Sequence, residues 1–174
     1  GKGAPVLLRG LTGEVPAPKD PKIGACVLEA VYTDIGRGLA APLSGKGAIR
    51  LRSRRVEAES GDVHGPQTLS FGSASGKRGL GAINDQHHVK FSALNLADCG
   101  SITLRTASAG QGGKIELRAG SATGELFATV DIPVTGGWEK WQEKTVPLAL
   151  HDGRSDVYVV FRNPGKGGLM NLDW

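Results

Sequence analysis

Residues 101–118, SITLRTASAGQGGKIELR, decide the fold class of this chain. Ile102 and Leu104 alternate with polar residues, and so do Ile115 and Leu117, which is the period of a β-strand with one buried face. The glycine-rich segment between the two runs supplies residues that adopt positive φ in turns without steric cost. The stretch therefore predicts two strands joined by a turn.

The same pattern divides most of the chain. Short alternating runs are closed by glycine-rich segments, and helical periodicity is almost absent. From residue 100 onward the runs recur about every 10–13 residues, a spacing typical of antiparallel sandwiches and not of βα units. We therefore expect an all-β chain, an antiparallel β-sandwich of the jelly-roll type. The expected strands are Cys26–Thr33, Ala48–Ala58, Gln67–Phe71, His87–Phe91, Ser101–Ala107, Lys114–Arg118, Leu126–Ile132, Trp138–Pro147, Ser155–Phe161 and Gly168–Trp174.

Three segments are expected along the chain. Residues 1–24 contain four prolines amid glycine and lysine, which predicts a linker or an irregular lead-in. Residues 25–54 predict an N-terminal strand pair, either an extension of the sandwich or the end of a preceding domain. Residues 55–174 are expected to form the sandwich itself.

Composition excludes several classes of protein. A chain of 174 residues suffices for one good-sized domain with an extra segment, and a hydrophobic fraction of 39% is too high for a disordered chain. No apolar run approaches the roughly 18 residues of a membrane span, so no membrane partner is expected. The sequence does not begin with Met and lacks a signal-peptide pattern, which predicts a mature fragment of a longer protein.

The net charge of +4 is unevenly distributed. Residues 1–55 carry ten Lys and Arg against four Asp and Glu, whereas residues 56–174 carry eleven against thirteen. A nucleic-acid-binding domain would spread its basic charge over the folded unit, so no nucleic-acid partner is expected. Arg50, Arg52 and Arg54 alternate as on one strand face, which fits a solvated face, with polyanion binding as the alternative.

Catalytic motifs are incomplete in this sequence. The segment Gly72-Ser-Ala-Ser-Gly76 places Ala74 where a hydrolase nucleophile would stand. Cys26 and Cys99 lack metal-ligand spacing, and two separate thiols are favoured over one disulfide bridge. The sequence therefore offers no convincing catalytic set, and we expect no enzymatic activity.

The histidines do not suggest a metal site. His87 and His88 are adjacent, so on a strand they point to opposite faces and cannot bind the same ion as neighbours. His64 and His151 fall in expected loops without a nucleophile beside them.

Glu57 and Glu59 are separated by one residue, and this spacing suggests a cation-binding pair. On the expected strand both side chains face the same way, and two like charges side by side repel unless a cation or a basic partner separates them. Ca²⁺, which takes about six to eight oxygen ligands, suits such a pair. Asp173, in the expected last strand, would join them if the first and last strands are close. The alternatives are a solvated pair and a glycosidase-like acid/base pair.

Trp138 and Trp141 differ in their expected exposure. At positions i and i+3 of a strand they point to opposite faces. Trp138 directly follows two glycines and is the better candidate for an exposed platform, on which an indole stacks against the apolar face of a sugar ring. Trp141 and Trp174 are expected to pack in the core.

Several segments together resemble carbohydrate-binding module family 6, a calcium-containing β-jelly-roll family. The resemblance spans residues 55–174 and implies a non-catalytic module or fragment of a larger secreted enzyme. Such a module attaches the enzyme, extracellular or periplasmic, to a polysaccharide. Other domains of the parent chain would be further partners. Residues 27–52 are similar to a strand pair that precedes such modules in large secreted multi-domain bacterial proteins. The matching segments are Val56-Glu-Ala-Glu59, Leu80-Gly-Ala-Ile83, Lys114-Ile-Glu-Leu-Arg118, Thr135-Gly-Gly-Trp-Glu-Lys-Trp141 and Gly168-Leu-Met-Asn-Leu-Asp-Trp174.

The resemblance implies a structural Ca²⁺ and its ligands. Glu57, Glu59 and Asp173 match the family's calcium-binding carboxylates. A backbone carbonyl at or near Lys77 would complete the set.

The resemblance also implies a sugar cleft. Trp138 matches one aromatic wall of that cleft, and Asn171 matches the amide that hydrogen-bonds the sugar. The family usually places Tyr or Trp where this chain has Ala82, and a Gly-Asp-aromatic triplet where it has Gln86-His-His88. Because Ala82 removes one stacking surface, the alternative function is a structural or docking module without a sugar ligand.

Overall fold

The computed structural model describes residues 7, 9–10, 14, 26–36, 41–51, 53–97, 99–148, 154–165 and 167–174. They belong to two compact units, residues 1–54 and residues 55–174. Most of the expected lead-in and His151 lie outside the described residues, as do the side chains of Cys26, Arg50 and Arg52. In the described part of the chain no helix is long and apolar enough to cross a membrane.

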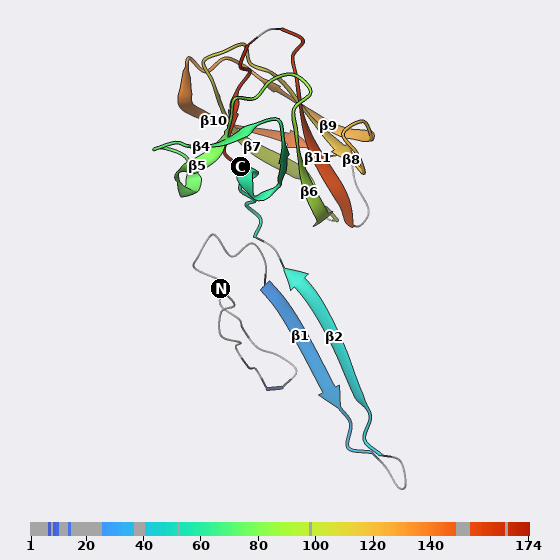
Figure 1. The fold of residues 1–174 in the computed structure, drawn as a ribbon. Coiled ribbons are helices and arrows are strands. Elements are labelled where there is room, and N and C mark those ends of the chain that lie inside the picture. The colour runs from blue at the N-terminus through green and yellow to red at the C-terminus, as the bar shows by residue number, and fades with distance from the viewer. Residues whose placement is uncertain are drawn as a thin grey trace. The chain divides into compact units, whose positions relative to one another are not determined.

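The described part of the first unit is a hairpin. Strands β1 (Cys26–Thr33) and β2 (Ser44–Leu51) pair antiparallel over their whole length (Figure 1). One face of the hairpin carries an ion pair of 3.1 Å between Glu29 Oε2 and Lys46 Nζ. On the other face Leu28 lies opposite Ile49, and both side chains are exposed. Val27 and Val31, which are also exposed, share the face of the ion pair, so apolar side chains lie on both faces of the hairpin.

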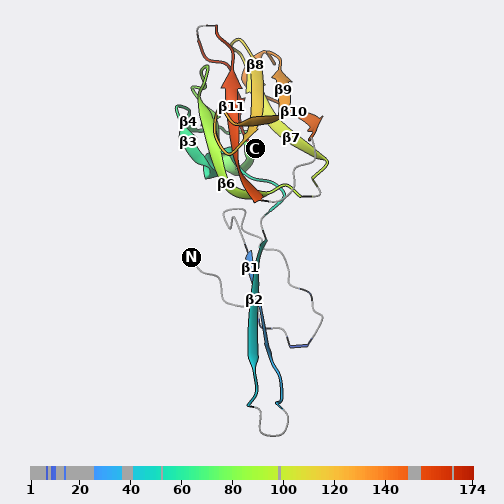
Figure 2. The ribbon, with the colours of Figure 1, turned by 90° about the vertical axis from the view of Figure 1, so that its right-hand side faces the viewer.

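The second unit consists of two five-stranded antiparallel sheets packed as a sandwich (Figures 1 and 2), which confirms the predicted fold class. In spatial order the first sheet contains β10 (Gly137–Pro147), β7 (Ser101–Ser108), β12 (Asn171–Leu172), β5 (Arg78–Gly81) and β4 (Gln67–Ser70). The second contains β3 (Asp62–His64), β6 (His88–Asn95), β11 (Arg154–Arg162), β8 (Gly113–Ala119) and β9 (Glu125–Ile132).

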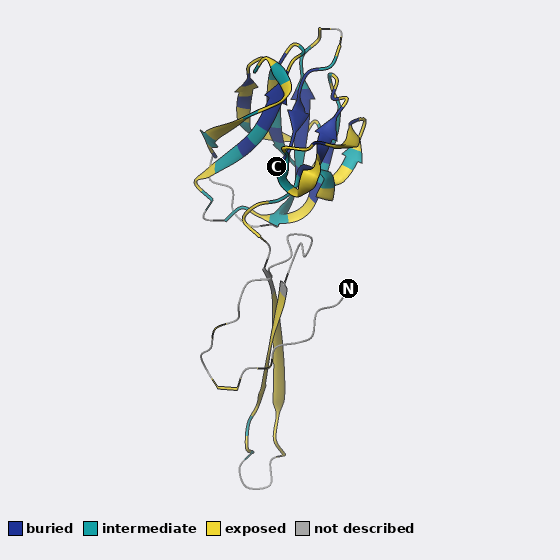
Figure 3. Ribbon diagram, turned by 90° about the vertical axis from the view of Figure 1, so that its left-hand side faces the viewer, coloured by how far each residue is buried: buried dark blue, intermediate teal, exposed yellow. Residues whose placement is uncertain are grey.

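The core lies between the two sheets, where burial is concentrated in Figure 3. Ile115 and Leu117 of β8 are fully buried, as the alternation predicts, and Leu104 of β7 is buried with them. Ile102 is only partly buried and packs against the edge of this core. The largest fully buried side chain is Phe161 of β11. Alternation of period two therefore determines which face of each strand points inward.

Some predicted strand bounds are wrong. The strand expected over Ala48–Ala58 ends at Leu51, and a short 3₁₀ helix, η1 (Ala58–Ser60), follows. The reason is tertiary, because the buried Ala58 donates its backbone N–H to the carbonyl of Asp173 at 2.9 Å.

Two further differences concern short elements. Strands β3 and β5 were not predicted, because each has at most four residues and contains or adjoins glycine. The strand expected over Gly168–Trp174 is reduced to β12. After β12 the chain still bonds to β7, since Asp173 N donates to Arg105 O at 2.9 Å.

Candidate functional site

The two glutamates predicted to bind calcium lie on a tight turn. Glu57 is the N-cap of η1 and Glu59 lies within it, so the expectation that both project from one strand is wrong. Ser75 Oγ donates a hydrogen bond of 2.8 Å to Glu57 Oε1. Among the described residues, Glu57 Oε2 and Glu59 Oε2 are buried and have no hydrogen-bond partner. The turn thus leaves two unpaired carboxylate oxygens.

The electrostatics of this cluster favour an added positive charge. Burial raises the pKa of the Glu59 carboxyl, and the negative charges of Glu57 and Asp173 raise it further. The positive charge of Arg78 acts in the opposite direction and does not cancel this effect.

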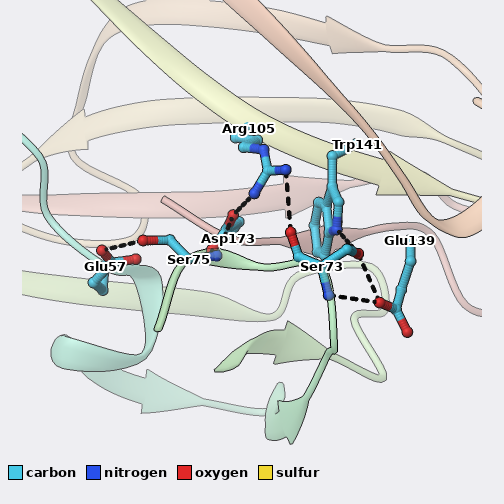
Figure 4. Close-up of polar contacts among 7 residues, drawn as sticks. All are labelled: Glu57, Ser73, Ser75, Arg105, Glu139, Trp141 and Asp173. Carbon is cyan, nitrogen blue, oxygen red and sulfur yellow. Dashed lines mark hydrogen bonds and ion pairs between the residues drawn. The ribbon is translucent and has the colours of Figure 1, made fainter. Parts of the chain in front are cut away.

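Asp173 links the cluster to the first sheet. Its side chain is fully buried and accepts hydrogen bonds from the backbone N–H of Ser75, at 3.0 Å, and from Arg105 Nη1 (Figure 4). Ser75 belongs to η2 (Ser75–Lys77), a short 3₁₀ element after β4. One serine therefore bonds Glu57 through its hydroxyl and Asp173 through its backbone N–H.

The residues present fit a hard cation in part. The two unpaired oxygens of Glu57 and Glu59 are of the kind that Ca²⁺ prefers. The carbonyl of Lys77 accepts one hydrogen bond, from Phe71 N at 3.1 Å, and a carbonyl oxygen has a second lone pair. Within the described ranges no three His, Cys, Asp or Glu side chains converge as a ready metal cluster. A cation here would need backbone carbonyls besides the carboxylates.

The predicted sugar-binding residues lie at the other end of β12. Trp138, near the start of β10, is 43% exposed. Its ring lies against Gly110 and Gly168, where an added Cβ would come within 2.8 Å and 3.3 Å of Trp138 Cη2. Asn171 is buried, and its Nδ2 donates a 2.7 Å hydrogen bond to the carbonyl of Trp138. The structure thus brings the predicted platform and the predicted amide together.

Ala82 directly follows β5 and is exposed, with φ at 51° in the left-handed region. Its carbonyl accepts a 3.3 Å hydrogen bond from Asn84 Nδ2. Gln86, where the resemblance places glycine, also has a positive φ, of 65°. The backbone of this loop therefore has the conformation that glycine favours, while no aromatic side chain stands at position 82.

Other aromatic residues differ from expectation. Trp141 and Trp174 are half-buried and not in the core. Arg55 stacks its guanidinium 4.5 Å from the centre of the Trp174 ring. His64 is on β3 and stacks on His88 of the neighbouring strand, with ring centres 4.7 Å apart. Sequence reasoning missed this pair because β3 was not predicted.

The fold and the exposed indole define a class. The two antiparallel sheets make residues 55–174 a β-sandwich domain, and its exposed indole lies beside a buried amide.

Residues 57–174 match the sequence profile of the family Carbohydrate binding module (family 6), and the chain belongs to this family. Its members are non-catalytic modules, so the expectation of a non-catalytic carbohydrate-binding module is confirmed.

Similar proteins include modules of enzymes and isolated modules. The chain is 34% identical over 128 residues to an arabinoxylan arabinofuranohydrolase of Paenibacillus polymyxa, covering 68% of this chain and 20% of that protein. It thus spans about a fifth of this curated relative. A β-1,3-glucan-binding module of Bacillus halodurans is 39% identical, with a TM-score of 0.64, covering 68% of this chain and 90% of that one. A module of Clostridium cellulolyticum in complex with xylose is 30% identical, with a TM-score of 0.64, covering 68% and 92%.

Proposed function

We propose that this module binds a β-linked polysaccharide, a glucan or a xylan, with Trp138 as the stacking platform and Asn171 as the hydrogen-bonding amide. The observation that supports the proposal best is the exposed Trp138 ring, which lies against Gly110 and Gly168. The backbone carbonyl of Trp138 accepts a hydrogen bond from the Asn171 amide. Similar structures are a β-1,3-glucan-binding module and a xylose complex. Binding is reversible and weak, with a Kd of about 0.1–1 mM, because one indole and one amide provide few contacts.

The proposal includes a structural Ca²⁺. Glu57 and Glu59 would supply the two oxygens that lack partners, with further oxygens from Asp173 and the carbonyl of Lys77. The ion supplies positive charge among three carboxylates and so stabilises the folded state. The hydrogen bond from Ser75 of η2 to Glu57, the N-cap of η1, holds the two short elements next to each other.

The module would act as part of a longer, secreted protein, outside the cell or in the periplasm. Relatives of this chain are glycoside hydrolases, of which it spans 20% and 24% of the length. A non-catalytic module in such a protein keeps the catalytic domain near its polysaccharide. The partners are then a polysaccharide or oligosaccharide and the other domains of the same polypeptide.

Retention on immobilised polysaccharides tests the proposal. Residues 1–174 are passed, with calcium present, over xylan, arabinoxylan, β-1,3-glucan and cellulose, beside Trp138→Ala and the control Leu126→Ala. Leu126 is an exposed apolar residue of β9, 46% exposed, so its variant controls for the loss of an apolar surface group. We expect retention of the wild type and of Leu126→Ala by one glycan class, and no retention of Trp138→Ala. Equal retention of all three proteins would contradict the site.

A structural or docking module without a sugar ligand is the second candidate. The exposed Ala82 favours it, because the position offers no ring to enclose a sugar. A folded, calcium-loaded protein that no glycan retains would support this second function and contradict the first.

A further inference from the structure

The proposed platform lies in an irregular part of β10. Gly137 pairs with Ser108 of β7, but the next registered pair is Gln142 with Thr106. Residues 138–141 therefore stand opposite the single residue Ala107, and none of the four has a registered partner on β7. A segment that leaves the regular ladder is not positioned by strand pairing alone. Side-chain contacts must hold it in place.

Ser73, in the connection after β4, provides such contacts (Figure 4). Its backbone N–H and its hydroxyl both donate to Glu139 Oε2, at 3.2 Å and 2.7 Å. The same hydroxyl accepts a 2.8 Å hydrogen bond from Trp141 Nε1. One serine thus binds two side chains of the irregular segment.

Ser73 is itself held by the first sheet. Arg105 Nη2 donates to the carbonyl of Ser73 at 3.2 Å, and Arg105 Nη1 bonds the buried Asp173. The Arg105 guanidinium also lies 5.3 Å from the centre of the Trp141 ring. Phe71, two residues before Ser73, contacts the same ring edge-on, with centres 5.5 Å apart. The serine is therefore a fixed anchor for the segment.

We propose that Ser73 is a positioning residue for sugar binding. Through Glu139 and Trp141 it fixes the shape of residues 138–141, and thereby the direction of the Trp138 ring, which directly precedes Glu139. The inference rests on the proposed function of Trp138. A hydroxyl is needed because it must donate to a carboxylate and accept from an indole N–H at once, which Thr also does and Ala does not.

The test compares Ser73→Ala, Ser73→Thr and the control Ser70→Ala, an exposed serine of β4. We measure the Kd for an oligosaccharide of the glycan that retains the wild type, the melting temperature, and the ¹⁵N-indole resonances without ligand. Ser73→Ala loses the hydroxyl's hydrogen bonds to Glu139 and from Trp141. We expect this variant to bind about tenfold more weakly, with the indole peaks of Trp138 and Trp141 shifted. Ser73→Thr and Ser70→Ala bind within about twofold of the wild type.

A wild-type Kd in Ser73→Ala would overturn the proposal, as would an equal loss in Ser73→Thr. If Ser73→Ala does not fold, Glu139→Ala replaces it, with Glu143→Gln of the regular part of β10 as its control. Glu139→Ala must then weaken binding while Glu143→Gln does not. If no glycan retains the wild type, the proposed function fails. Positioning is then judged from the ligand-free spectra, where an unchanged Trp138 indole peak in Ser73→Ala overturns it.

Discussion

Removal of the proposed Ca²⁺ should destabilise the sandwich, because it would leave two buried carboxylate oxygens unpaired. Glu57 Oε2 and Glu59 Oε2 are buried without a hydrogen-bond partner among the described residues. Leaving a buried polar atom unpaired costs about 1–3 kcal/mol, so the two oxygens together cost about 2–6 kcal/mol when no ion is bound. Both side chains are only partly buried, which favours the lower end of that range, about 2–3 kcal/mol.

A cost of this size is readily measured as a change in Tm. For a unit of this length 1 kcal/mol corresponds to about 4 °C, so the chelated protein should melt about 8–12 °C below the calcium-loaded one. The assay is a thermal scan by circular dichroism with excess calcium and with chelator, with metal content verified by elemental analysis. In Glu57→Gln/Glu59→Gln the chelator should have no further effect, whereas Glu125→Gln, an exposed carboxylate of β9, should behave as the wild type. An unchanged Tm in verified metal-free protein would refute the reasoning.

Three further predictions concern the sugar cleft, the core and an ion pair. Ala82→Trp should tighten oligosaccharide binding about threefold to tenfold in calorimetry, because a second ring adds stacking, and weaker or equal binding would show that position 82 does not face the ligand. Leu80→Ala should lower the free energy of unfolding in urea by about 2–5 kcal/mol, because Leu80 is fully buried, and a loss below about 1 kcal/mol would contradict its place in the core. The hydrogen bond from Lys90, with a second from the Ala93 backbone, lowers the pKa of Asp156 below its ordinary value of 3.8. The stability from this pair is therefore present above that value and lost as the pH falls through the lower, folded pKa. Asp156→Asn should lose less stability than the wild type between about pH 6 and pH 2. An identical dependence of the free energy of unfolding on pH in both proteins would exclude the Lys90–Asp156 pair as a contributor.

Much of the fold could be predicted from the sequence, since one-face burial leaves a clear period of two. Ile115 and Leu117 are fully buried because their alternation leaves no other arrangement in a sandwich. Strand β3 could not be predicted, because Asp62–His64 is short and its pairing with β6 is fixed by distant residues. The η1 turn was missed for a similar reason, since the hydrogen bond from Ala58 to Asp173 joins residues near opposite ends of the sandwich sequence.

The candidate site was only partly predictable. The residues Trp138 and Asn171 could be named from a resemblance, and the structure places them in contact. The register shift on β10 and the three hydrogen bonds between Ser73 and β10 leave no signal in the sequence, because they depend on how the connection after β4 meets β10 in space. Alternation therefore misleads at residues 138–141, where Trp141 is half-buried and bonded instead of packed in the core.

The central claim, that Trp138 binds the sugar, is tested most directly by the indole ¹⁵N–¹H resonances. The chain has three tryptophans, so each gives one assignable peak. Titration with xylo- and gluco-oligosaccharides should shift the Trp138 peak in a saturable way and leave that of Trp174 unchanged. A saturable shift confined to Trp174, or to backbone peaks on the β3–β6 face around His64 and His88, would contradict the claim. So would the absence of any shift at millimolar ligand.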